Sequence, residues 1–247
     1  MSGFWVMRIA KRWIRRFFLG FLGIAAIFTG GTALSMTLSM LLSLGLYAAA
    51  FGFQFAAGFV VLLGLHEMGH WLASRVVGLG VLPPMFIPFF GAVIRLKQAP
   101  YNAKMEANIA LGGPAMGTLS ALLFLTFYFW EGNLLLLILA HTACLLNLFN
   151  LIPCDPMDGG RIAPAITARL WWVGSGVIAL LFFYTGNFFL LVIFFISLIR
   201  LWFHEETEEN KYYYRLTGQQ RLKVAFWYFG LLCVLGLTAL YTRHLLQ

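Results

Sequence analysis

Long apolar stretches separated by short polar breaks dominate the pattern of this chain. A helix that crosses a bilayer needs about 20 predominantly apolar residues, and several of these stretches meet or approach that length. The stretch at 17–28 is shorter, which fits half a span or a helix lying at the membrane interface. The predicted spans are 32–51, 54–77, 107–130, 134–152, 171–184, 188–203 and 224–242. The pattern therefore predicts an all-α polytopic membrane protein with about six or seven transmembrane helices.

Two segments between the predicted spans have a different character. Four prolines lie in 78–106, and within that loop the segment Phe86–Leu96 is rich in aromatic and β-branched residues. This composition favours a strand, so we expect a short membrane-associated β segment between the second and third spans, with a plain interfacial loop as the alternative. The segment Pro153–Arg161 contains two prolines and two glycines, which predicts a break in helical structure after the fourth span.

Composition supports the membrane class and bounds the domain organisation. The chain has 247 residues, of which 61% are hydrophobic and 11% charged, whereas a soluble domain carries about 25% charged residues. Little sequence is therefore left for a soluble domain. We divide the chain into a basic interfacial N-terminal segment (1–31), a membrane core (32–170) and C-terminal transmembrane helices (171–247), the last with a polar cytoplasmic loop at 204–223.

The placement of Lys and Arg predicts the orientation of the spans. Five of the seventeen basic residues fall within residues 8–16. Such clusters stay on the cytoplasmic side of a membrane, so this one indicates a juxtamembrane anchor and we expect no nucleic-acid partner. Successive crossings then put 78–106 and 204–223 inside and Glu131 outside. The prediction is a multi-pass protein of the cell membrane, in contact with the lipid bilayer and with a cytoplasmic N-terminus.

The sequence His66-Glu67-Met68-Gly69-His70 lies inside the second predicted span. The spacing i, i+4 puts both imidazoles on one helical face, where they can bind one zinc ion. Glu67 lies beside them, where it can take a proton from a water that the ion activates. Ionisable side chains at membrane depth are costly and are functional candidates by default. The sequence therefore predicts a zinc site within the bilayer.

A catalytic zinc takes three protein ligands and keeps one position open, so a third ligand must lie at similar depth. Asp155 and Asp158 follow the fourth span on the same predicted side of the membrane. His141 lies nine residues before Asn150 and therefore deeper, and we expect it to be a helix-packing residue. The residues alone leave both aspartates as candidates.

At Asn150-Leu-Ile-Pro-Cys-Asp-Pro-Met-Asp158-Gly-Gly the chain resembles the site-2 protease family, whose pattern here is N-x-x-P-x-x-P-x-D-G-G. Members of this family are intramembrane zinc metalloproteases. The resemblance implies that His66, His70 and Asp158 bind one Zn²⁺ per chain and that Glu67 is the catalytic base. It also implies that Asn150 contacts the substrate or the oxyanion.

The resemblance extends over roughly residues 33–170 and includes Gly113-Pro114 in the third span. It departs from the usual pattern at Met157, where leucine is more common, and at Asp155, where an apolar residue is common. The implied function is cleavage of transmembrane or membrane-adjacent segments of membrane-protein substrates, with the active site opening to the cytoplasm. A strand at Phe86–Leu96 would then contact the substrate by β-addition. The alternative is a transporter or ion-conducting protein that uses the buried His, Glu and Asp side chains.

Overall fold

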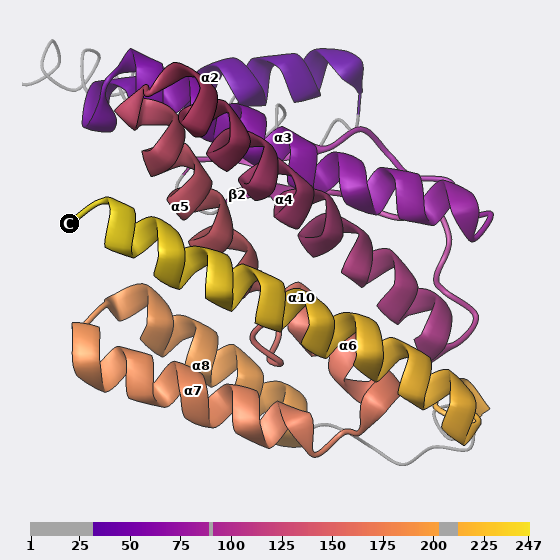
Figure 1. Cartoon of the computed structure of the whole chain (residues 1–247). Helices are drawn as coiled ribbons and strands as arrows, with labels where there is room; N and C mark the ends of the chain where they lie inside the picture. Colours follow the sequence, from indigo (N-terminus) through magenta and orange to yellow (C-terminus); the bar gives the residue numbers. More distant parts are fainter. Residues whose placement is uncertain (1–31, 89–90, 203–211) are drawn as a thin grey trace, which may run out of the picture. The chain divides into compact units, whose positions relative to one another are not determined.

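The computed structural model describes residues 32–88, 91–202 and 212–247 (Figure 1). The predicted interfacial segment 1–31 and most of the first half of the predicted loop 204–223 lie outside the described residues. The helices are α2 (Ala33–Phe51), α3 (Phe53–Val76), α4 (Ala103–Glu131), α5 (Leu134–Asn150), α6 (Asp158–Ile166), α7 (Leu170–Thr185), α8 (Phe188–Trp202) and α10 (Gly218–Leu245), and the strands are β1 (Met85–Ile87) and β2 (Gly91–Val93). The predicted helical fold with a short β segment between the second and third spans is confirmed.

The described residues fall into two compact units, and the boundary between them lies within α3. One unit contains the described residues up to Val60 together with Leu82–Arg95. The other contains Val61–Val81 and Leu96–Gln247.

In the first unit, α2 covers one edge of the small sheet. A capping box between Thr32 and Ser35 starts α2, which then buries a polar stripe at intervals of four residues, consisting of Ser35, Ser39, Ser43 and Tyr47. The backbone N–H of Phe86 in β1 donates to Ser39 Oγ at 3.2 Å. Strands β1 and β2 are antiparallel, with the pairs Met85↔Val93, Phe86↔Ala92 and Ile87↔Gly91. Because the backbone N–H of Phe86 donates to Ser39 in α2, this N–H is not available to another strand at the outer edge of β1.

In the second unit, α4 is the central helix and packs against α5, α6 and α10. Close approach of α3 to α4 depends on glycines, because a Cβ at Gly69 would clash with the carbonyl of Gly112. The hairpin of α7 and α8 is joined by a hydrogen bond between Ser175 Oγ and Ser197 Oγ at 2.5 Å, and the two helices lie side by side in Figure 1.

Helix α10 packs against α5, α4 and α6 and buries a seam of residues three or four apart, which are Val224, Tyr228, Leu231, Leu235, Ala239 and Thr242. In this seam His141 Nδ1 lies 2.9 Å from the hydroxyl of Thr242. This contact between helices fits the expectation that His141 is a helix-packing residue.

Two predicted segment boundaries differ from those of the observed helices. The segment predicted as a break, Pro153–Arg161, ends in the first turn of α6, which starts at Asp158. Helix α10 begins at Gly218, inside the predicted loop 204–223, because Thr217 and Gln220 form a capping box there. The predicted turn at 131–133 is confirmed, with Gly132 at φ 68° ending α4 and Asn133 capping α5.

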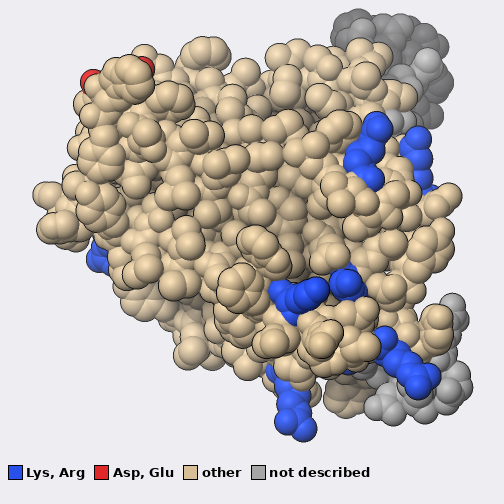
Figure 2. All heavy atoms as spheres, turned by 45° about the vertical axis from the view of Figure 1, so that its right-hand side comes forward, with Lys and Arg blue, Asp and Glu red and all other residues tan. Residues whose placement is uncertain are grey.

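Four helices are long and apolar enough to cross a membrane, namely Ala33–Phe51, Phe53–Val76, Ala103–Glu131 and Gly218–Leu245. Three further apolar helices among the described residues are shorter, Leu134–Asn150, Leu170–Thr185 and Phe188–Ile199. The count of six or seven spans therefore stays a prediction. Figure 2 shows broad areas of surface that carry neither basic nor acidic side chains, which suits contact with lipid tails.

Candidate metal centre

Helix α3 presents the motif on the face that packs against α4. His66, Glu67 and His70 are all buried, with exposed fractions of 4%, 5% and 8%. The imidazoles are one helical turn apart, and their Nε2 atoms lie 3.1 Å from each other. The local spacing of the motif is thus sufficient to bring two ligand atoms together.

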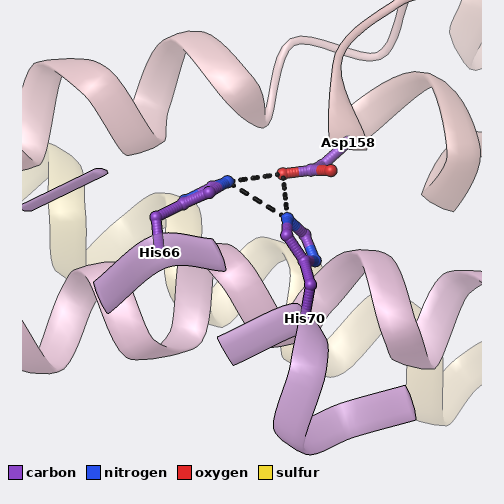
Figure 3. A group of neighbouring side chains, drawn as sticks. All are labelled: His66, His70 and Asp158. Carbon is purple, nitrogen blue, oxygen red and sulfur yellow. Dashed lines mark hydrogen bonds and ion pairs between the residues drawn. The ribbon is translucent and has the colours of Figure 1, made fainter. Parts of the chain in front are cut away.

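Asp158 supplies the third atom, from the first residue of α6. Its Oδ2 lies 3.2 Å from Nε2 of His66 and 3.2 Å from Nε2 of His70 (Figure 3). Tetrahedral ligands bound to zinc at about 2.0–2.1 Å lie about 3.3 Å from one another. The triangle of ligand atoms therefore matches three corners of a zinc tetrahedron. Among the described residues this is the group of His, Cys, Asp and Glu side chains found close enough together to hold a metal ion.

Hydrogen bonds on the far side of each ring determine where its hydrogen lies. His70 Nδ1 lies 2.9 Å from the carbonyl oxygen of Ile109, which can only accept, so Nδ1 carries the hydrogen. His66 Nδ1 lies 2.8 Å from Asn147 Oδ1. Both Nε2 atoms then present lone pairs toward Asp158.

Asp158 Oδ2 is buried and has no hydrogen-bond partner among the described residues. Three lone-pair atoms at 3.1–3.2 Å repel one another unless positive charge lies between them. A proton can join only two of the three atoms, whereas a metal ion binds all three. The residues present therefore fit zinc.

Glycine on α4 leaves the space that this arrangement needs. A Cβ at Gly113 would lie 2.5 Å from Cε1 of His70 and 2.8 Å from Nε2 of His66. A Cβ at Gly117 would overlap the amide of Asn147. The small residues of the third span, which the sequence suggested for close helix packing, thus border the ligands and their partners directly.

The other predicted site residues lie nearby with different surroundings. Glu67 is close enough to His70, His66 and Asp158 to interact with them electrostatically. Asn150 is half-buried at the last position of α5, and its Nδ2 donates to the carbonyl of Leu146 at 3.0 Å.

Asp155, the alternative third ligand, is half-buried and does not belong to the metal-binding group. Sequence reasoning missed Asn147. Its signal was a second amide, three residues before Asn150, in an otherwise apolar helix.

Comparison with known proteins finds a family and individual proteins that resemble part of this chain. The model of peptidase family M50 matches residues 54–135. This matched stretch, the M50 segment, covers about a third of the chain. It contains His66, Glu67 and His70 and ends before Asp158. The resemblance to zinc metalloproteases of the site-2 protease type is confirmed at the level of the family.

Relatives of the chain carry zinc metalloprotease names. It is 34% identical over 110 residues to the zinc metalloprotease MJ0392 of Methanocaldococcus jannaschii, covering 42% of this chain and 32% of the relative. It is 31% identical over 135 residues to the putative zinc metalloprotease Rip3 of Mycobacterium tuberculosis, covering 47% and 31%. It is 28% identical over 153 residues to the probable chloroplastic zinc metalloprotease EGY2 of Arabidopsis thaliana, covering 44% and 28%.

The matches thus cover about a third of the length of these curated relatives. Among solved structures, the chain is similar to a site-2 protease from Methanocaldococcus jannaschii, with a TM-score of 0.42 and 21% sequence identity. That similarity covers 74% of this chain and 88% of the other.

Proposed function

We propose that this chain is an intramembrane zinc metalloendopeptidase that cleaves transmembrane or membrane-adjacent segments of other proteins. The observation that carries the proposal is the convergence of three potential ligand atoms from His66, His70 and Asp158. The M50 segment and the zinc metalloprotease relatives support it. A zinc ion held by these residues would polarise a substrate carbonyl and lower the pKa of a water molecule toward about 7.

Glu67 is the general base of this proposal. Its carboxylate takes a proton from the attacking water as the carbon–oxygen bond forms, and returns it to the amine that leaves when the peptide bond breaks. The residue adjoins His66 in α3, and it is 5% exposed. Burial keeps bulk water away from this carboxylate, which strengthens its interaction with the reacting atoms.

Asn150 is proposed to bind the substrate backbone or the oxyanion. One N–H of its amide is taken by the carbonyl of Leu146. The second N–H and Oδ1 have no hydrogen-bond partner within the described part of the chain. An amide with one free donor and one free acceptor can hold an extended peptide by two hydrogen bonds.

An extended substrate is also proposed to add to the sheet at β2, within the predicted contact Phe86–Leu96. Phe86 N–H points away from β2, toward Ser39, so Phe86 and Ala92 form a pair without hydrogen bonds between them. The N–H and C=O of Ala92 then point away from β1, at the open edge of the sheet, where no strand in the described part of the chain pairs with β2. A substrate strand would satisfy these groups.

The active site is proposed to open toward the cytoplasm. Arg75 lies in the last turn of α3, with its guanidinium 4.9 Å from the ring centre of Trp71. Tryptophan and arginine together suit a membrane–water interface. His66 lies nine residues earlier in the helix, which puts it about 13 Å below that interface.

The proposed function is tested with Glu67→Gln. The amide keeps the size of the side chain but cannot act as a base, so the variant should bind about one zinc per chain and cleave nothing. Membrane proteomes of cells carrying either form should differ by full-length substrates that accumulate with the variant. Equal cleavage by both forms would contradict the mechanism. The ion-transport alternative predicts ion flux through reconstituted wild-type protein instead, and the comparisons give it no support.

A further inference from the structure

Asn147 is a buried polar residue that the proposed mechanism does not use. Its exposed fraction is 1%, and it lies in α5, whose other residues are mostly apolar. Burying an amide in such a helix costs free energy unless each polar atom finds a partner. The contacts that Asn147 makes therefore indicate its role.

The orientation of the amide is determined by its two partners. Asn147 Nδ2 donates to the carbonyl of Ala143 at 2.7 Å, since a carbonyl oxygen can only accept. Oδ1 must then be the atom that faces His66 Nδ1, at 2.8 Å. Because Oδ1 can only accept, the hydrogen of a neutral His66 is drawn to Nδ1. The lone pair is left on Nε2, the atom that lies against His70 and Asp158.

The amide of Asn147 fits in this position because the neighbouring residue on α4 is a glycine, Gly117. A Cβ at Gly117 would overlap Oδ1, Nδ2 and Cγ of Asn147. The contact thus joins three helices, because α5 provides the amide, α3 the histidine and α4 the space.

We propose that Asn147 is a positioning residue for the metal centre, which fixes the tautomer and ring orientation of His66. His70 receives the equivalent support from the backbone carbonyl of Ile109, which no side-chain substitution removes. Of these two contacts, the one made by Asn147 can therefore be removed by a side-chain substitution. This inference rests on the zinc site of the proposed function. Partners of this kind typically change metal affinity by about 10–100-fold.

Asn150 offers a matched control on the same helix. It lies three residues further along, carries the same side chain, and bonds the carbonyl of Leu146 as Asn147 bonds that of Ala143. It makes no hydrogen bond to His66 or His70 among the described residues. A general effect of losing an amide from α5 would appear in variants at both positions, whereas an effect on His66 would appear at Asn147 alone.

The test measures metal binding directly, on full-length protein in detergent. Zinc affinity is determined by competition with a chelator, and the absorption spectrum of the Co²⁺-substituted protein reports the geometry of the ligands. Asn147→Ala should weaken zinc binding by about 10–100-fold and alter the Co²⁺ spectrum. Asn150→Ala should leave both unchanged. Asn147→Leu keeps a side chain of similar volume but offers no acceptor to His66 Nδ1–H, so it should weaken zinc binding as Asn147→Ala does.

These outcomes separate the inference from the proposed function. Wild-type protein that binds no zinc would overturn both. Wild-type zinc affinity and spectrum in Asn147→Ala would overturn the positioning role and leave the zinc site standing. An Asn147→Leu variant that binds zinc with wild-type affinity would also overturn it, because the hydrogen bond to His66 would then be unnecessary.

Discussion

Replacing Gly113 with alanine tests the geometry of the metal centre without removing any ligand. The added Cβ would lie 2.5 Å from Cε1 of His70 and 2.8 Å from Nε2 of His66, whereas ordinary contacts begin at 3.4 Å. The Cβ would come closer still to Nε2 of His70, so the rings must retreat by at least about 0.6 to 0.9 Å. Zinc–ligand distances tolerate about 0.2 Å of deviation, so the displacement is several times what coordination allows.

We expect Gly113→Ala to weaken zinc binding by at least about 100-fold. The fold should survive, because overpacking costs about 1–3 kcal/mol and alanine returns up to about 1 kcal/mol of helix propensity. Zinc content of the purified protein and chelator competition measure the first effect, and thermal unfolding of the metal-free protein measures the second.

Gly64→Ala is the matched control for this experiment. It makes the same change in α3, one turn or less from His66, at a position where a Cβ meets nothing within 4 Å. This variant should bind zinc like wild type and unfold at an equal or higher temperature. Wild-type zinc affinity in Gly113→Ala would refute the reasoning, since the ligand atoms would then not lie against α4 as described.

Three further predictions concern the third ligand, the sheet edge and the topology. Asp158→Ala should lose zinc while Asp155→Ala retains it, as metal analysis of the two purified variants would show; the opposite result would make Asp155 the ligand. Ala92→Pro removes the N–H at the open edge of the sheet, so it should bind zinc normally but cleave slowly, whereas Ala92→Ser should cleave at the wild-type rate. Cleavage by the proline variant at the wild-type rate would exclude the edge as a substrate contact. A cysteine at Gln98 should react with an impermeant thiol reagent only from the cytoplasm and one at Asn133 only from the other side, and the reverse labelling would invert the proposed orientation.

The parts of the site that the sequence predicted are those with a local cause. His66 and His70 share a helical face because they are four residues apart, and this holds in any helix. The choice of Asp158 as the third ligand also required the family resemblance, because Asp155 was expected at the same depth and on the same side of the membrane. The contact between His66 and Asn147 joins residues 81 positions apart, and it depends on space at Gly117. No pattern within α5 alone specifies such a partner.

The start of α6 shows why the local pattern failed there. Two glycines after Asp158 disfavour a helix, since glycine costs about 1 kcal/mol relative to alanine in a helix interior. Packing overrides this preference. A Cβ at Gly159 would clash with the carbonyls of Leu151 and Ile152, and one at Gly160 would lie 2.7 Å from the backbone N of Asp155. Glycine is therefore required at these positions because the helix folds back closely onto the preceding loop.

The position of Asp158 in turn depends on elements that follow it in the chain. Trp171 Nε1 donates to the carbonyl of Gly160 at 2.8 Å, which holds the first turn of α6. Arg221 in α10 donates to the carbonyl of Ile166 at 2.9 Å, which holds the end of that helix. The M50 segment 54–135 contains two of the three proposed ligands, and these later contacts hold the helix that carries the third. We therefore expect the proposed metal centre to require α6 held by α7 and α10, so that the C-terminal helices would act on the chemistry through the placement of one carboxylate.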